Sequence, residues 1–332
     1  MPELRIDVGA IGTNTEVVAT LLREHRLDLV GVTKGCLGEP RVAAAMLAGG
    51  AVALADTRDR NLLRLRAALP HAELHRIHLP SLVEPFEPGD ITYVSSWRGA
   101  KAVAALPPTG AARRVVVLVE TGDEREGAPP EALPGLAAAI AGDPRLDLVG
   151  ISTNYACFRG EPDGIRASVE AVARAAAALR AAGRSVGRVS GGNSSLLRLL
   201  VQGESLPVEV TEVRCGEALL LGHDALCYQP VPGCRTDACI LRVEVLEEYT
   251  KPAREGKARR LVLGVGRQDL GSGSVTFRQP GLREIGRSAD YLVVEATAAC
   301  PGVSAGDMVD TVPTYEALVA AWTSPYVELR LY

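Results

Sequence analysis

The sequence is poor in aromatic residues, which make up 4% of its 332 positions, and it carries no excess of basic charge. With 36 basic against 40 acidic residues, its formal net charge is −4. Proteins that bind nucleic acid usually show a basic stripe and aromatic stacking platforms, so this composition argues against such a partner. The sequence also lacks an apolar run long enough for a membrane span and begins without a signal-peptide pattern, so we expect a cytoplasmic protein with no membrane contact.

Cysteine and histidine occur without the spacing of a metal site. Seven cysteines, an odd number, argue against a disulfide framework, and no Cys-x-x-Cys pair is present. Three of the five histidines, His71, His75 and His78, lie close together, but such a spacing alternates between the two faces of a strand. We therefore expect no metal site, with the thiols in the core and the imidazoles on the surface.

Hydrophobic residues make up 47% of the chain and fall into short β-rich runs separated by helical stretches such as Asp59–Ala68 and Gly164–Ala182. Eight runs precede residue 226: Leu29–Val32, Val52–Ala55, His75–Leu79, Ile91–Val94, Val115–Val119, Leu148–Ile151, Ser185–Val189 and Val208–Val213. Eight strands with helical or loop crossovers favour an α/β fold built on a (βα)8, TIM-like barrel. An open doubly wound sheet is the alternative, but the first strand lacks the Gly-x-Gly-x-x-Gly turn of such sheets.

The pattern changes after Leu226, where turns replace helices as the spacers between strands. Strand-like runs continue at Ala238–Leu246, Arg260–Gly264, Tyr291–Glu295, Met308–Val312 and Tyr326–Leu331. We expect residues 11–226 to form the barrel and residues 227–332 to form an all-β domain without long helices. Residues 1–10 are expected to add an N-terminal strand to that β domain.

Polar residues gather where the predicted barrel strands end, which is where (βα)8 enzymes carry their chemistry. Lys34 closes the first strand, and a lysine buried in the barrel mouth is a Schiff-base nucleophile, whereas the alternative is a solvated loop lysine. The small-residue segment Ser190–Ser195 precedes a helix and, with Arg214 and Gly216 one loop later, favours a phosphate site over a simple turn. An amine and a phosphate cradle together suggest pyridoxal 5′-phosphate as the cofactor.

These segments resemble the fold-type III pyridoxal-phosphate enzymes, the alanine racemase group, and are most similar to its ornithine racemase-like amino-acid racemases. The motifs that carry the resemblance run through almost the whole chain: Val32–Gly35, Leu54–Arg58, Glu120–Gly127, Gly150–Cys157, Ser190–Ser195, Arg214–Gly222, Gly266–Asp269 and Thr323–Tyr326. The resemblance implies an alanine racemase-like barrel with a C-terminal β domain, and a homodimer with its active sites at the interface. It also implies pyridoxal phosphate as the cofactor and racemisation of an amino acid, with ornithine or a related amino acid as the substrate.

The same resemblance implies roles for individual residues. Lys34 would hold the cofactor and serve one face of the substrate, and Arg125 would approach the cofactor's phenolic oxygen and the substrate carboxylate. Asn154 would lie against the pyridine ring, and Arg214 would pair with the ring nitrogen. The other expected cofactor contacts are Ser190, Asn193, Ser194 and Gly216.

The second acid–base group departs from the family pattern. Alanine racemases supply a tyrosine in a Gly-Tyr-Ala-Asp turn, and the matching turn in this sequence is Gly266–Asp269, with Arg267 at the tyrosine position. Because a racemase needs acid–base groups on both faces of the α-carbon, another residue must act. Cys157, Tyr155 and Arg267 are the candidates, and a thiol has the most suitable intrinsic pKa, about 8.5. The alternative for Cys157 is a small buried hydrophobe.

Acidic residues around Arg125 predict the substrate class. Asp123, Glu124 and Glu126 flank it and could receive a distal ammonium, which favours ornithine or another basic amino acid. Solvated carboxylates, or a Glu126 that only steers Arg125, are the alternative, and an inward Arg159 would instead favour an acidic or polar substrate. Further expected substrate contacts are Tyr155 and Tyr326.

Two other functions share the same scaffold. One is a pyridoxal-phosphate-dependent decarboxylase or lyase, and the other is a non-catalytic protein that only binds the cofactor. Related aldolases and dehydratases resemble enzymes with His and Cys metal ligands in the β domain, whereas this sequence has no histidine after His223. Non-catalytic carriers resemble the barrel alone, which the additional residues 227–332 argue against.

Overall fold

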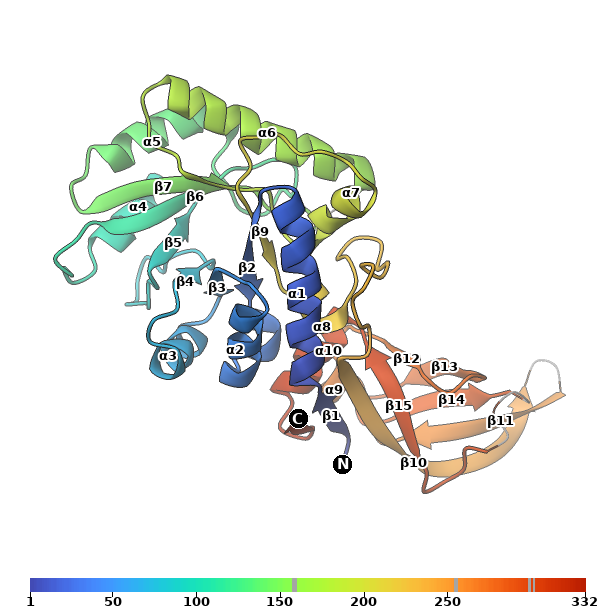
Figure 1. The fold of residues 1–332 in the computed structure, drawn as a ribbon. Coiled ribbons are helices and arrows are strands. Elements are labelled where there is room, and N and C mark those ends of the chain that lie inside the picture. Colours follow the sequence, from blue (N-terminus) through green and yellow to red (C-terminus); the bar gives the residue numbers. More distant parts are fainter. Residues whose placement is uncertain (157–159, 254–255, 298–299, 301) are drawn as a thin grey trace. The chain divides into compact units, whose positions relative to one another are not determined.

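A computed structural model describes residues 1–156, 160–253, 256–297, 300 and 302–332 (Figure 1). The chain divides into two compact units. The first unit contains Met1–Ala10, Gly35–Leu37 and Arg235–Tyr332, and the second contains Ile11–Lys34 and Gly38–Cys234. Within the residues described, no helix has the length and apolar character needed to cross a membrane.

The second unit is a closed barrel of eight parallel strands, which follow one another around the ring in chain order (Figure 1). The strands are β2 (Asp28–Val32), β3 (Ala53–Asp56), β4 (Leu74–Arg76), β5 (Ile91–Val94), β6 (Arg113–Leu118), β7 (Leu146–Ser152), β8 (Arg188–Ser190) and β9 (Glu212–Cys215). Strands β2 and β9 close the ring, with Val30 in register with Arg214. The predicted (βα)8 barrel is therefore confirmed.

Helices and short 3-10 turns occupy most of the crossovers between these strands. The helices are α1 (Val8–Glu24), α2 (Pro40–Ala48), α3 (Asp59–Ala68), α4 (Trp97–Ala104), α5 (Leu133–Ala141), α6 (Pro162–Ala181), α7 (Leu197–Val201) and α8 (Glu217–Leu221), and the 3-10 turns are η1 (Lys34–Cys36), η2 (Pro130–Ala132) and η3 (Ser194–Leu196). Leu136 and Ile140, one helical turn apart on α5, are buried in one cluster with Val115 and Val117 of β6. This apolar layer holds the helices outside the ring, which leaves the strand ends to carry polar loops.

The barrel interior also contains charged groups. His75 on β4 is fully buried, so the expectation of surface imidazoles is wrong for this residue. Its Nε2 lies 3.0 Å from Glu73 Oε1, and the same carboxylate accepts hydrogen bonds from Arg114 at 2.9 Å and Arg188 at 2.6 Å. His75 faces inward because strands of a barrel alternate between interior and exterior, and Glu73 supplies the partner that makes its burial tolerable.

Because of these contacts, we expect the stability of the fold to decrease at acid pH. The hydrogen bond from His75 is the main cause that lowers the pKa of Glu73 to about 2 from an ordinary value of 4.5. A carboxyl whose pKa is depressed by folding stabilises the protein above its unfolded pKa, and the contribution disappears as the pH falls toward the folded value. At about 1.4 kcal/mol per pKa unit the shift corresponds to about 3.4 kcal/mol of unfolding free energy, which solvent screening of the partly exposed carboxylate reduces to about 2–3 kcal/mol.

We therefore expect Glu73→Gln to lower the unfolding free energy at neutral pH by about 2–3 kcal/mol. The variant should also lose part of the decline in stability between about pH 5 and pH 2, as measured by urea titration at several pH values. The exposed Glu131→Gln is the matched control and should retain the wild-type profile. An unchanged pH profile in Glu73→Gln would contradict the assigned role of this carboxylate.

The first unit is built on an eight-stranded sheet, in which β12, β15, β10, β11, β14 and β13 lie side by side in that order. The strands are β1 (Glu3–Ile6), β10 (Cys239–Ala253), β11 (Gly256–Leu263), β12 (Val275–Phe277), β13 (Leu282–Arg287), β14 (Leu292–Ala296), β15 (Met308–Pro313) and β16 (Glu328–Leu331). Strand β1 pairs antiparallel with β10 and parallel with β16, and the other pairs are antiparallel. The predicted second, β-rich domain is confirmed.

Two short helices accompany the sheet in this unit. They are α9 (Arg267–Leu270) and α10 (Tyr315–Thr323), which pack against each other. Helix α10 buries Ala317, Leu318, Ala321 and Trp322, whose spacing of one and four positions is that of an amphipathic helix. The segment is only nine residues long and has no side-chain N-cap, so its helical signal in the sequence is weak.

Candidate active site

Lys34 lies two residues after Val32, the last residue of β2, so its side chain starts at the carboxyl end of a barrel strand. The preceding residue, Thr33, is fixed by a hydrogen bond of 2.6 Å from its hydroxyl to Asp56 Oδ2 at the end of β3. The other oxygen of Asp56 accepts from the side-chain amide of Asn61 at 2.9 Å and from two backbone N–H groups of the following turn. This carboxylate therefore ties two neighbouring strand ends together and sets the position from which Lys34 extends.

Arg214 lies on β9 and is only 5% exposed. Its guanidinium donates hydrogen bonds to the hydroxyl of Ser152, to the hydroxyl of Ser190 at 2.6 Å and to the carbonyl oxygen of Thr153 at 2.8 Å. Every one of these partners is neutral, and within the described part of the chain Arg214 makes no ion pair. A buried cation with neutral partners only remains available to an acceptor in the barrel mouth.

Asn193 joins the loops that follow β7 and β8. Its side-chain oxygen accepts from the Ser195 N–H at 2.8 Å, which caps η3, and its amide donates to Asn154 Oδ1 at 3.1 Å and to the carbonyl of Tyr155 at 2.8 Å. Asn154 in turn donates to Asp123 Oδ2 at 3.2 Å. These amide contacts bring the loops after β6, β7 and β8 together at one end of the barrel.

Small residues shape the loops after β8 and β9. The Ser194 hydroxyl accepts from the backbone N–H of Ala218 at 3.3 Å and so links the two loops. Gly216 packs so closely on β2 that a Cβ atom there would lie 2.9 Å from the carbonyl oxygen of Val32. The close packing on β2 therefore requires glycine at position 216, where α8 begins.

Arg125 is partly exposed in the loop after β6 and is held by carboxylates on both sides. Its Nε lies 3.5 Å from Asp123 Oδ2, and its Nη2 donates to Glu126 Oε1 at 2.7 Å. Glu120 fixes the turn by accepting from the backbone N–H groups of Gly122 at 2.6 Å and Glu124 at 3.2 Å. Asp123 and Glu126 are therefore both engaged by Arg125, which fits the alternative in which Glu126 steers Arg125.

The candidates for the second acid–base group lie on separate segments. The Tyr155 hydroxyl accepts from the Glu161 N–H at 3.3 Å. Arg267 is the exposed first residue of α9, in the first unit. Cys157, the third candidate, and Arg159 lie outside the described residues.

Tyr326 belongs to the same unit as Arg267 and is 58% exposed. Its backbone N–H donates to the Ser324 hydroxyl at 3.2 Å, and that hydroxyl donates to Asp269 Oδ1 at 2.8 Å. Asp269 also accepts from the Gly266 N–H at 3.3 Å and thereby holds the turn that carries Arg267. The two motifs of the first unit singled out in the sequence are thus joined through one carboxylate.

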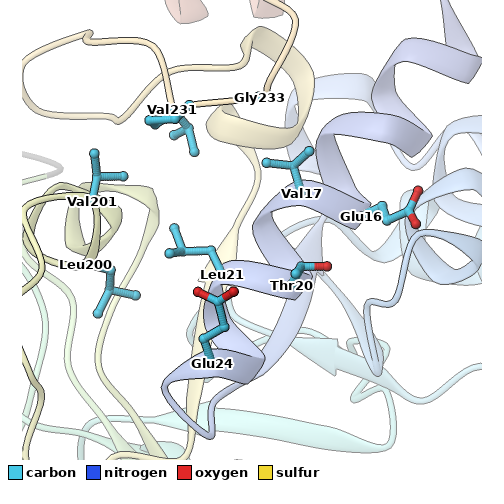
Figure 2. Close-up of a pocket in the computed structure, with 10 residues that line it drawn as sticks. Glu16, Val17, Thr20, Leu21, Glu24, Leu200, Val201, Val231 and Gly233 are labelled. Carbon is cyan, nitrogen blue, oxygen red and sulfur yellow. The ribbon is translucent and has the colours of Figure 1, made fainter.

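A pocket of about 540 Å³ in the second unit lies between α1, α7 and residues 231–233 (Figure 2). Val17, Leu21, Leu200 and Val231 give it apolar walls, and Glu16 and Glu24 also line it. No residue predicted for the site lines this pocket, so it is separate from the polar strand ends. Within the described residues, no three His, Cys, Asp or Glu side chains are grouped to hold a metal ion.

Two relatives align with this chain over nearly its whole length. A lysine racemase from Thermotoga maritima is 29% identical, and the match covers 98% of this chain and 97% of the relative. An ornithine racemase from Acetoanaerobium sticklandii is 26% identical over 99% of both chains.

Solved structures share the fold. Alanine racemase from Corynebacterium glutamicum superposes with a TM-score of 0.77 at 21% identity, over 100% of this chain and 99% of its own. D-threonine aldolase from Filomicrobium marinum gives a TM-score of 0.78 at 20% identity, over 97% and 89%. The sequence model of the family described as alanine racemase, N-terminal domain, matches residues 6–224. The chain, with its eight-stranded barrel and the lysine at the end of β2, therefore belongs to the alanine racemase N-terminal domain family.

Proposed function

We propose that this protein is a pyridoxal-phosphate-dependent amino-acid racemase whose preferred substrate is a basic amino acid, ornithine first. The racemase activity and the cofactor follow from the family and from the two full-length relatives, which are a lysine and an ornithine racemase. The observation that carries the proposal for the site is the pairing of β2 with β9. It brings the strand that ends in Lys34 next to the strand that carries Arg214.

The chemistry of the described residues fits this cofactor. The cofactor needs an amine for its aldehyde, a polar group for its ring nitrogen and a site for its phosphate. The barrel supplies the amine of Lys34, the buried guanidinium of Arg214 with its neutral partners, and the turn that contains Gly216. The residues proposed to hold it are Lys34, Arg125, Asn154, Ser190, Asn193, Ser194, Arg214 and Gly216. When bound, the cofactor withdraws electron density from the α-carbon of the substrate and so acidifies the α-proton.

The protein's own groups then determine where the proton moves. Lys34 takes or returns the α-proton on one face with its amine. Arg214 donates a hydrogen bond to the ring nitrogen but keeps its own protons, because a guanidinium is not deprotonated in proteins. A guanidinium at that position would therefore leave the ring nitrogen without a proton. A second group, for which we propose Cys157 ahead of Tyr155 and Arg267, completes racemisation on the opposite face.

The alternatives have weaker support. D-threonine aldolase shares the fold at 20% identity, and a likeness at that level extends to the fold alone. The sequence has no histidine after His223 to bind a metal in the β-rich unit. A cofactor carrier has no use for the complete first unit, which the two racemase relatives share.

The substrate preference is tested by comparing kcat/KM for ornithine, lysine, alanine, serine and glutamate. We expect the two basic amino acids to exceed the others by roughly tenfold or more, because a charge-assisted hydrogen bond contributes about 1.5–3 kcal/mol. Asp123→Asn should reduce that discrimination, and Glu131→Gln, an exposed substitution outside this group of carboxylates, should preserve it. Higher wild-type kcat/KM for alanine or glutamate would refute the basic substrate and leave the racemase activity intact.

We also propose that the active form is a homodimer whose partner subunit closes each site. Closure by two chains would exclude water from the reacting carbon, and the resemblance of the sequence to the alanine racemase group implies such a dimer. Sedimentation at assay concentration should show a species of twice the mass of one chain, and dilution below its dissociation constant should reduce specific activity. A fully active monomer would contradict the proposal.

A further inference from the structure

Tyr93 on β5 is fully buried inside the barrel and has an unusual neighbour. The Cζ atom of Arg214 lies over its ring, 5.2 Å from the ring centroid. Tyr93 also belongs to an apolar cluster with Ile91, Val116 and Leu118, which holds its ring in place. The guanidinium of Arg214 therefore rests on an aromatic face that is itself immobilised by packing.

The hydroxyl of Tyr93 anchors the ring on its other side. It donates to Glu212 Oε1 at 3.5 Å, and Glu212 Oε2 accepts from Arg188 at 3.0 Å. Burial raises the pKa of Tyr93 and the charge of Glu212 raises it further, whereas the charge of Arg214 and a hydrogen bond with its guanidinium lower it. The phenol consequently remains protonated, and Tyr93 presents a neutral ring face to the cation.

The contacts of Arg214 divide into two kinds. The hydrogen bonds to Ser152, Ser190 and the Thr153 carbonyl point outward along the plane of the guanidinium, because all of its N–H groups lie in that plane. They fix its rotation but resist displacement perpendicular to the plane only weakly. A ring beneath the cation supplies the missing constraint, and a cation–π contact is strongest in a desolvated site such as this one.

We propose that Tyr93 is a positioning residue for Arg214, which uses its ring face to hold the guanidinium at the depth where it meets the cofactor ring. The inference rests on the proposed function, because it assigns Arg214 to the ring nitrogen. It predicts that losing the aromatic ring of Tyr93 has a larger effect than losing its hydroxyl alone.

The test compares Tyr93→Phe, Tyr93→Leu and Val116→Ala, a matched control that removes packing from the same cluster. For each purified protein, the dissociation constant of pyridoxal phosphate and the position of its visible absorption band are measured. We expect Tyr93→Leu to weaken cofactor binding about tenfold or more and to shift the band. Tyr93→Phe should stay within about threefold of wild type with an unshifted band. Val116→Ala should lower the melting temperature alone.

Two outcomes would separate the possible failures. If Tyr93→Leu binds pyridoxal phosphate as tightly as Val116→Ala and shows the same absorption band, the positioning role is overturned. If the wild-type protein binds no pyridoxal phosphate, the proposed function is overturned. If Tyr93→Leu does not fold, the side-chain NMR signal of Arg214 in wild type decides, identified by its loss in Arg214→Lys. Ring current should move this signal upfield of exposed arginines, with and without cofactor, and an unshifted signal would refute the stacking.

Discussion

Lys34→Ala is expected to abolish both racemisation and the visible absorption band of the bound cofactor. The barrel unit contains two lysines, and only Lys34 follows a strand, since Lys101 lies exposed on α4. An amine that both anchors an aldehyde cofactor and exchanges the α-proton has no substitute in that position. Turnover should therefore fall below detection in either direction, measured with both enantiomers of the substrate.

Lys101→Ala is the matched control and should retain the colour and the rate of the wild type. Borohydride should bleach the wild-type protein and fix the cofactor covalently, and mass spectrometry should then locate it on the peptide that contains Lys34. A Lys34→Ala protein that stays yellow after dialysis and racemises at the wild-type rate would refute the assignment of the cofactor-binding lysine.

The second large effect is expected for Cys157→Ala, which should slow racemisation by roughly 10²-fold or more while cofactor binding survives. The reason is that Lys34 serves one face of the α-carbon and the family's tyrosine is replaced by Arg267 in this sequence. A thiol has an intrinsic pKa of about 8.5, the nearest to neutrality among the three candidates.

Isotope exchange in deuterium oxide makes this experiment specific for one face. If Cys157 serves the face opposite Lys34, Cys157→Ala should stop α-proton exchange for one enantiomer and preserve it for the other. Tyr155→Phe and Arg267→Ala, tested in parallel, should retain exchange for both enantiomers. Unchanged rates in Cys157→Ala would exclude the thiol, and the variant that then shows one-sided exchange identifies the acting group.

The sequence predicts those site residues whose position follows from the order of strands in a (βα)8 barrel. Strands in a (βα)8 barrel end on one side, so Lys34 after β2 and Ser190 at the end of β8 were placed together from their positions along the chain. The motifs of the racemase family then assigned their roles. Neither argument needed a measured distance.

The same argument does not predict which side chains meet inside the barrel. Tyr93 lies in the run Ile91–Val94, where an aromatic residue is indistinguishable from ordinary core. Its contacts with Glu212 and Arg214 join strands separated by more than a hundred residues, and only the closure of the ring shows which side chains meet. The inward position of His75 is likewise fixed only by the closed ring, which determines the face of β4 that is buried.

The polar side chains inside the barrel also restrict how this protein can be redesigned. Arg114, Glu73, Arg188 and Glu212 alternate in sign, and each carboxylate is shared or bordered by an arginine. Removing a single member leaves a neighbouring charge without its partner, whereas replacing a pair by apolar residues of similar volume is often neutral. Libraries aimed at a new substrate should therefore vary these positions in couples of opposite sign.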